Sequence, residues 1–415
     1  MTLLRKSAGY CLSLALAGAA HLSAADLLQP VDEALHFETR NGAMRADVSG
    51  LLDIEGYYVE QPSPALLFED DDFFFNPRLS LFLDANLGKH FYMFVQARAD
   101  RGFDPGAEPD GEIRADEYFV RYTPWPAPII NIQAGKFATV FGRWVDRHDS
   151  WNNPFINAPL SYEHMTIMGD QAALAAPGPF LARKAAPTNK RGWLPIIWGP
   201  SYATGASIFG AIERFDYAVE VKNAGLSSRP SAWDPLENSW EHPTFTGRLG
   251  YRPSAAWNVG ASASVGAFYL PVAEATPGFT ANARTLDDYR QITIGSDVSY
   301  AWHHWQIWGE AMASRFETPA VGDADSLAYF LEAKRKLGAH WFVAGRWNQQ
   351  LFDDVRNSAG SSEEWDDDLW RIDAALGYRH NRHLQAKLQY SFTREHSGAP
   401  QQGDQLIAAQ LTVKF

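Results

Sequence analysis

The residues best suited to chemistry lie together in the run Arg143-Trp144-Val145-Asp146-Arg147-His148-Asp149-Ser150. This run brings two guanidinium groups beside two carboxylates, an imidazole and a hydroxyl. Guanidinium groups recognise anions, and charges that line a narrow passage of low dielectric bias which ions enter it. The same arginines could instead form salt bridges with Asp146 and Asp149 that fix the segment in one conformation. The sequence leaves both interpretations open.

Three further cations are candidates for the same role. Two of them lie on the polar side of segments in which apolar and polar residues alternate. Lys136 falls on the apolar side of its segment, and only a β-bulge at Gly135 would turn it to the polar side. Cations grouped at a constriction would favour anions. The predicted pore-lining residues are Arg98, Arg121, Lys136, Arg143 and Arg147.

Catalytic chemistry has little support in the sequence. The run His148-Asp149-Ser150 contains the three residue types of a serine-hydrolase triad, but sequence neighbours cannot form that geometry without partners elsewhere. The chain has no G-x-S-x-G or H-E-x-x-H motif and no glycine loop that would hold a phosphate. His303-His304 lies in a short turn, where an interfacial role is favoured over metal binding. We expect no catalytic residue, no metal and no cofactor.

Strands must position these side chains, and a period-two alternation predicts them. In 369–379 and 383–395 one face is apolar and aromatic while the other is charged, with a short turn between the two segments. Such faces fit a strand between lipid and water, although a half-buried sheet in a soluble sandwich gives the same alternation. About sixteen strands are predicted, at 46–59, 73–85, 90–100, 115–122, 129–141, 201–212, 215–223, 244–252, 256–269, 288–300, 304–316, 326–336, 340–350, 369–379, 383–395 and 405–415.

The connections favour a membrane barrel over a sandwich. Short ones, such as 86–89 and 337–339, alternate with long ones, which include 142–200 and 317–325. Outer-membrane barrels have short periplasmic turns and long external loops. We therefore predict an all-β fold, a transmembrane antiparallel up-and-down β-barrel over 46–415. About 14 to 18 strands are possible, because a hairpin could lie hidden around Trp193 to Trp198.

Closure of such a barrel pairs the backbone polar groups that lipid cannot solvate. About sixteen strands leave a lumen too wide for side chains to fill. The long third loop, 142–200, exceeds the usual ceiling for structureless loops of about 12–15 residues and is too apolar for free disorder. We predict that this extracellular loop folds into the lumen and narrows it.

The N-terminus reads as a secretory signal peptide over 1–25. Arg5 and Lys6 precede a short apolar stretch, and Ser23-Ala24-Ala25 forms a small-residue cleavage site. An uncleaved anchor helix is disfavoured because the apolar stretch is too short to span about 30 Å of hydrocarbon. The segment 26–45 is predicted to be a periplasmic N-terminal segment, either a small hairpin or a floppy leader.

The C-terminus supports the same fold, because the alternating run 406–415 ends in Phe415. A terminal aromatic of this kind resembles the C-terminal strand of outer-membrane barrels, which the assembly machinery reads. Aromatic residues make up 13% of the chain and include 15 Trp, and they gather toward the two ends of the predicted strands. Such rings form girdles at the two membrane interfaces.

Composition excludes several other classes. The 415 residues include 36 basic and 49 acidic side chains, and removing 1–25 leaves a net charge of −15, which argues against nucleic acid as a partner. The single cysteine, Cys11, lies in the signal peptide, so the mature chain has no disulfide or thiolate chemistry. Three long connections are acidic, at 69–72, 104–112 and 363–368. They could bind divalent cations with lipopolysaccharide, or be solvated loop tips.

A family resemblance starts from the run Gln133-Ala134-Gly135-Lys136-Phe137-Ala138-Thr139-Val140-Phe141-Gly142, followed by Arg143-Trp144 and Asn153-Pro154-Phe155. It resembles the Gly-Lys-Phe…Phe-Gly segment of the phosphate-selective porin family. The barrel plan and the terminal Phe agree with that family. The resemblance implies a sixteen-stranded, typically trimeric porin with a basic constriction that favours anions.

The predicted function follows from the barrel and the resemblance together. We expect an outer-membrane porin of a Gram-negative bacterium, with a water-filled channel for small hydrophilic solutes and a preference for anions or phosphate. The expected partners are outer-membrane lipid and lipopolysaccharide, the solutes or anions themselves, the barrel-assembly machinery through Phe415, and two further copies in a homotrimer. The alternatives are an outer-membrane barrel enzyme, such as a lipase or protease, and a structural or adhesive barrel.

Overall fold

The computed structural model describes residues 34–60, 65–68, 71–185, 192–234, 240–281, 283–396 and 404–415. The predicted signal peptide, the start of the N-terminal segment and part of the acidic run at 69–72 lie outside this range. No helix within the range is both long enough and apolar enough to cross a lipid bilayer.

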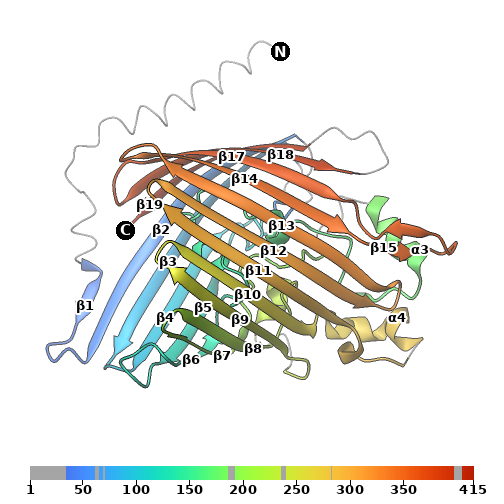
Figure 1. The fold of residues 1–415 in the computed structure, drawn as a ribbon, viewed down its shortest axis with the longest axis horizontal. Coiled ribbons are helices and arrows are strands. Elements are labelled where there is room, and N and C mark those ends of the chain that lie inside the picture. Colours follow the sequence, from blue (N-terminus) through green and yellow to red (C-terminus); the bar gives the residue numbers. More distant parts are fainter. Residues whose placement is uncertain are drawn as a thin grey trace, which may run out of the picture.

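Sixteen antiparallel strands form a closed barrel, in which each strand pairs with its neighbours in the chain (Figure 1). The ring closes where the last strand pairs with the first long one, for example at Gln410 opposite Glu55. The strands of the barrel are β2 (Met44–Val59), β3 (Phe73–Leu87), β4 (Phe91–Asp100), β5 (Glu112–Tyr122), β6 (Asn131–Lys136), β7 (Thr204–Ile212), β8 (Phe215–Lys222), β9 (Thr244–Ser254), β10 (Trp257–Ala267), β11 (Arg290–Trp302), β12 (Trp305–Thr318), β13 (Gly322–Lys336), β14 (Trp341–Phe352), β17 (Leu369–Arg379), β18 (Leu384–Glu395) and β19 (Asp404–Lys414).

Smaller elements lie on the connections and at the N-terminal end. The strands β15 (Asp354–Arg356) and β16 (Ser362–Glu364) form a separate hairpin before β17. The short helices are α3 (Pro177–Leu181), α4 (Pro277–Thr280), η1 (Val145–Arg147), η2 (Leu160–Tyr162), η3 (Ala182–Ala185), η5 (Pro230–Trp233), η6 (Pro271–Ala275) and η7 (Leu286–Asp288).

The alternation directs polar residues into the barrel and apolar residues outward, as predicted. On β17, Arg371 and Asp373 are buried while Ile372 between them is 45% exposed. On β18, Lys387 is buried while Leu388 is 44% exposed. An apolar outer surface over a polar interior matches a wall between lipid and water.

Three details of the sequence prediction are wrong. The connection at 317–325 is short, because β12 ends at Thr318 and β13 begins at Gly322. No strand forms within 192–203, so the hairpin proposed around Trp193 to Trp198 is absent from this described stretch. Three aromatic residues near the long-loop ends of their strands, Tyr57, Phe268 and Phe316, are buried and therefore do not contribute to a girdle, and Phe268 packs against Phe316.

A β-bulge does occur, but on β5 and not at Gly135. The register of β4 against β5 shifts so that Asp116 has no partner on β4. The pairing of β6 with both neighbours stays regular through Gly135, and Lys136 lies half-buried with its Nζ donating to the Ala115 carbonyl at 3.2 Å. The bulge lets two consecutive acidic residues, Asp116 and Glu117, both face the interior.

Both described ends of the chain are tied to β2. The strand β1 (His36–Glu38) pairs with the start of β2, which forms the hairpin that Asn41-Gly42 suggested. At the other end, Phe415 exchanges two backbone hydrogen bonds with Gly50, at 2.8 and 3.1 Å. A Cβ added at Gly50 would lie 2.3 Å from the Phe415 ring, so the glycine makes room for the terminal aromatic.

Candidate functional site

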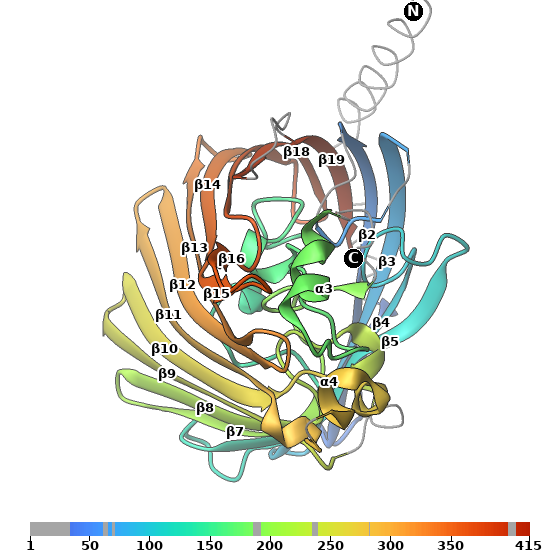
Figure 2. The same ribbon diagram turned by 90° about the vertical axis from the view of Figure 1, so that its right-hand side faces the viewer.

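In the connection between β6 and β7, the described residues 137–185 and 192–203 lie largely within the ring of strands (Figure 2). We call this connection the inner segment. Its described residues contact inward-facing side chains along most of the wall, from β5 through β12, β13 and β14 to β18. The inner segment also supplies many of the largest buried apolar side chains, including Tyr162, Met168 and Trp198.

Carboxylates on one side of the wall accept backbone N–H groups of the inner segment. Glu310 on β12 accepts from the N–H groups of Arg143 and Trp144, each at 2.6 Å, and from the Tyr162 hydroxyl at 2.5 Å. Three other wall residues act in the same way along the chain: Glu117 accepts from Ala138 at 3.1 Å, Glu220 from Val140 at 3.3 Å, and Ser262 from Gly142 at 3.1 Å.

Cations and amides on β14, β17 and β18 donate to the carbonyl groups of the inner segment. The Nζ of Lys387 on β18 donates to the carbonyls of Ser150, Asn153 and Phe155, at 2.8, 3.1 and 3.0 Å. Neighbouring wall residues extend this contact: Arg346 donates to Asn157 and Ala158, Arg371 to Ala158 and Glu163, and Arg379 to Trp151. Much of the lumen charge therefore holds the inner segment in place.

Two cavities that described residues line lie beside the inner segment, and residues of β17 to β19 and of β2 to β5 form the wall around them. The first, of about 160 Å³, is lined by Val59 at the end of β2 and by Thr393 on β18, and we call it the long-loop cavity. The second, of about 340 Å³, is lined by Ser49 and by Lys414, near the opposite ends of their strands, and we call it the short-turn cavity. The two cavities adjoin, because the same four residues line both: Arg78, Phe103, His148 and Pro200.

Arg78 on β3 is the charged wall residue at this junction. Its Nη2 lies 3.0 Å from Asp53 and 2.6 Å from Glu55, both on β2. The Arg78 side chain is 18% exposed, whereas those of Asp53 and Glu55 are 1% and 0% exposed. The guanidinium therefore faces the cavities with its carboxylates behind it, and its Nη1 makes no hydrogen bond to any residue that the structure describes.

Arg98 on β4 repeats this arrangement in the short-turn cavity. Its Nε lies 3.1 Å from Asp116, the residue that the β-bulge turns inward. The Arg98 side chain is 12% exposed and that of Asp116 is 3% exposed, so the cation again lies nearer to the cavity. Of the five predicted pore-lining residues, Arg98 is the one that lines either cavity.

The other predicted cations are engaged elsewhere. Arg121 donates to Gln133 at 2.9 and 3.1 Å and lies among aromatic rings, while Lys136 bonds the β5 backbone. Arg143 pairs with Asp146 at 3.0 Å, as the salt-bridge interpretation of the sequence proposed. Arg147 pairs with Glu332 on β13 at 2.6 Å and lies over a tryptophan ring. The structure therefore does not bring the five together at one constriction.

Arg78 lies on the polar side of the predicted strand 73–85, but it is not among the predicted pore-lining residues. A signal was available, because Arg78 pairs directly with Asp53 across β2 and β3, in a strand pair that the alternation predicts. A second group was missed near the short turns, where three cations lie over aromatic rings: Lys334 over Phe342 at 4.3 Å, Arg379 over Trp151 at 4.4 Å, and Lys414 over Trp151 at 5.6 Å.

The run His148-Asp149-Ser150 does not form a triad. The ring nitrogens of His148 lie 2.6 Å from the Val145 carbonyl and 2.5 Å from the Tyr202 hydroxyl. Asp149 accepts from the backbone of the next turn and from Asn152, so it is not oriented toward His148. In the part of the chain that the structure describes, no group of three or more His, Cys, Asp or Glu side chains is arranged to hold a metal ion.

Two acidic residues of the long connections are not solvated loop tips. Asp104 is buried and accepts from the Trp198 indole N–H at 2.9 Å, and burial raises the pKa of this carboxyl to about 7. Asp366 is also buried and accepts from the Ile167 N–H at 2.8 Å. Both carboxyl groups therefore hold the inner segment from the long-loop end.

Comparison with family models and with curated proteins finds no match. Solved structures do match across most of the chain. An anion-selective porin from Comamonas acidovorans is 11% identical with a TM-score of 0.56, and the match covers 90% of this chain and 100% of the porin. Salmonella typhi OmpF in complex with Daunomycin is 10% identical with a TM-score of 0.57, and the match covers 91% of this chain and 100% of OmpF.

The outer membrane channel DcaP of Acinetobacter baumannii is similar in the same way, at 9% identity and a TM-score of 0.55, with 91% of this chain and 99% of DcaP covered. Identities this low define the fold alone. The chain has the sixteen-stranded barrel fold that these outer-membrane proteins share. The resemblance to the phosphate-selective porin family stays a prediction.

Proposed function

We propose that the protein is a porin of the outer membrane of a Gram-negative bacterium, a passive channel for small hydrophilic solutes with a preference for anions. The observation that carries this proposal is the pair of adjoining cavities beside the inner segment, with Arg78 at their junction. A closed barrel with an apolar exterior satisfies its backbone within lipid, and a water-accessible interior then connects the two sides.

The charge distribution along this path supports the anion preference. Arg78 and Arg98 face the cavities while their carboxylates lie behind them, so a permeating ion meets the guanidinium groups first. Lys334, Arg379 and Lys414 add positive charge near the short turns, and none of them forms an ion pair with a carboxylate that the structure describes. Because most lumen cations are neutralised by partners, the preference should be modest.

The remaining predictions belong to the same proposal. We assign the short turns to the periplasmic face and the long connections to the external face, as in other barrels of this kind. A homotrimer follows from the resemblance, contact with lipopolysaccharide from the acidic connections, and recognition of Phe415 by the assembly machinery from the aromatic end of the last strand. A specific preference for phosphate has less support, because the exposed guanidinium groups stand singly and each has a carboxylate partner.

Planar bilayers test the proposal directly. Purified mature protein should give stepwise conductance, and its reversal potential in a potassium chloride gradient should have the sign of an anion-preferring pore. Arg78→Gln should shift that potential toward cations, because Asp53 and Glu55 would lose their main cation. The control is Arg315→Gln. Arg315 forms an ion pair with Asp325 in which the side chains are 45% and 33% exposed, and Arg315 lines neither cavity, so this substitution should leave the potential unchanged.

Three outcomes would overturn all or part of the assignment. A protein that inserts but never conducts would favour a structural or adhesive barrel that the inner segment plugs. A reversal potential of the opposite sign would retain the channel and remove the anion preference. Hydrolysis of a lipid or peptide that is lost on Ser150→Ala would instead favour the enzyme alternative.

A further inference from the structure

We infer that the channel is built for small organic anions with an apolar body about the size of one ring, rather than for inorganic anions alone. This inference rests on the proposed channel function and names the class of solute that the long-loop cavity fits. It starts from the lining of that cavity, which combines an apolar wall with a single available guanidinium group.

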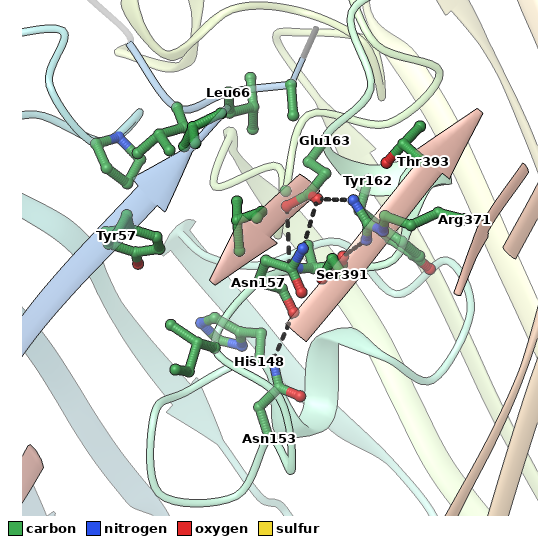
Figure 3. Close-up of a pocket in the computed structure, with 18 of the residues that line it drawn as sticks. Tyr57, Leu66, His148, Asn153, Asn157, Tyr162, Glu163, Arg371, Ser391 and Thr393 are labelled. Carbon is green, nitrogen blue, oxygen red and sulfur yellow. Dashed lines mark hydrogen bonds and ion pairs between the residues drawn. The ribbon is translucent and has the colours of Figure 1, made fainter. Parts of the chain in front are cut away.

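The apolar wall is formed by strand ends and by the inner segment. Val59 ends β2, Leu406 lies on β19 with its side chain inward, and Ile156 projects from the inner segment. Further apolar residues of the lining are Ala65, Leu66, Leu67, Phe103 and Pro105, and polar side chains, among them Glu163, Asn153, Asn157 and Gln405, form the rest of it. Tyr57 and Leu66 lie on one side of this space, and Arg371, Ser391 and Thr393 lie on the other (Figure 3). A passage meant only for hydrated inorganic ions gains nothing from such a wall, because apolar surface does not replace their hydration.

The volume sets the size of the solute. The long-loop cavity measures about 160 Å³. An apolar cavity of about 150 Å³ in another protein accommodates a benzene molecule. The space therefore fits the apolar part of a one-ring solute in contact with its walls.

The anionic group of the solute has one clear position. Arg371 also lines the cavity, but its three nitrogen atoms already contact Glu163, Ala158 and Asp373. Arg78 lies at the inner end of the cavity, where its Nη1 makes no hydrogen bond to a described residue. If the carboxylate of the solute lies beside Arg78, the ring of the same solute lies against the apolar wall. The next guanidinium on the path, Arg98, lies in the adjoining cavity.

Ion substitution in planar bilayers tests this inference, with sodium benzoate, sodium acetate and sodium chloride as probes. Acetate is smaller and diffuses faster, so a plain aqueous pore would pass it better than benzoate. We expect the benzoate-to-acetate permeability ratio to exceed one in the wild-type channel. Leu406→Ala and Ile156→Ala should each lower this ratio by about fourfold or more, because about fourfold corresponds to one buried methylene group and each substitution removes three carbon atoms. Arg78→Gln should lower benzoate permeability, whereas Arg78→Lys should retain it.

The matched control is Leu411→Ala. Leu411 is the same residue type on the same strand as Leu406 but faces outward, where it is exposed. Leu411→Ala should leave the benzoate-to-acetate permeability ratio unchanged. This result would show that a leucine-to-alanine substitution on β19 does not by itself alter selectivity. A wild-type channel that conducts chloride but prefers acetate would overturn this inference alone. A wild-type protein that conducts no ion would overturn the proposed channel function as well.

Discussion

Glu310 is predicted to be the main attachment of the inner segment to the barrel wall. It is buried on β12 and accepts three hydrogen bonds from residues 143, 144 and 162 of the inner segment. Glu310→Ala would leave two N–H groups and one hydroxyl without this partner. Each buried polar group left unpaired costs about 1–3 kcal/mol. Because water can enter the space left by the side chain, we take the lower end of this range for each group. The three groups together then cost about 3 kcal/mol.

Hydrogen exchange of the mature protein in detergent measures this cost. Local opening of the inner segment exposes to water the groups that bonded Glu310 in the wild type. The variant loses stability only in the closed state, so its free energy of opening is lower by that amount. About 3 kcal/mol corresponds to an exchange rate about 100-fold higher for the amides of Arg143 and Trp144. The amides of strands far from β12, such as those of β3, should keep their wild-type rates. In bilayers, the same variant should show larger fluctuations of the open-channel current.

The matched control is Glu317→Ala, because Glu317 lies on the same strand and accepts a backbone N–H from Arg290, outside the inner segment. It should leave exchange at Arg143 and Trp144 unchanged. Equal exchange rates in wild type and Glu310→Ala would refute the view that wall carboxylates hold the inner segment. So would an equal increase in both variants, because a general loosening of β12 would then explain the result.

Three further predictions concern the other attachments. Lys387→Met should lower the thermal unfolding temperature and raise the current noise, because three carbonyls of the inner segment lose their donor. Burial raises the pKa of Asp366 to about 8, so between about pH 4 and 8 the folded state keeps a proton that the unfolded state releases. The free energy of unfolding therefore decreases as the pH rises through this window. Asp366→Asn, which cannot titrate, should make this decrease smaller. Gly50→Ala should reduce the yield of assembled barrel in outer-membrane fractions, because the added Cβ would overlap the Phe415 ring, whereas Gly345→Ala, with open space around it, should not.

The barrel strands could be predicted from the sequence because their signal is local. On β17 and β18 every second residue changes between polar and apolar, and lipid outside with water inside imposes that period on each strand separately. The β-bulge at Asp116 was not predicted, since two consecutive acidic residues break the alternation without indicating which strand absorbs the extra residue. The short connection between β12 and β13 was not predicted, because the polar residues at the ends of both strands are typical of a long loop.

The conformation of the inner segment could not be predicted, because its partners are distant in the sequence. The N–H of Arg143 bonds Glu310, 167 positions away, and the carbonyl of Ser150 accepts from Lys387, 237 positions away. No local period encodes such contacts. The sequence therefore indicates that a long apolar loop must be buried. It does not indicate which wall residues bond that loop or which wall residues stay accessible to solutes.

This distribution of partners changes how the lumen charge must be read. A carboxylate such as Glu310 or a cation such as Lys387 looks, from its position on an inward face, like a group that attracts or repels permeating ions. In the structure both are committed to the backbone of the inner segment, so their charges are largely opposed by N–H and C=O dipoles at close range. The selectivity of the channel should then depend on the few groups that retain an accessible atom, above all Arg78.

The chain as a whole is acidic, with a net charge of −13. This net charge does not conflict with a path that prefers anions, because charges more than about 10 Å from the path are screened by salt.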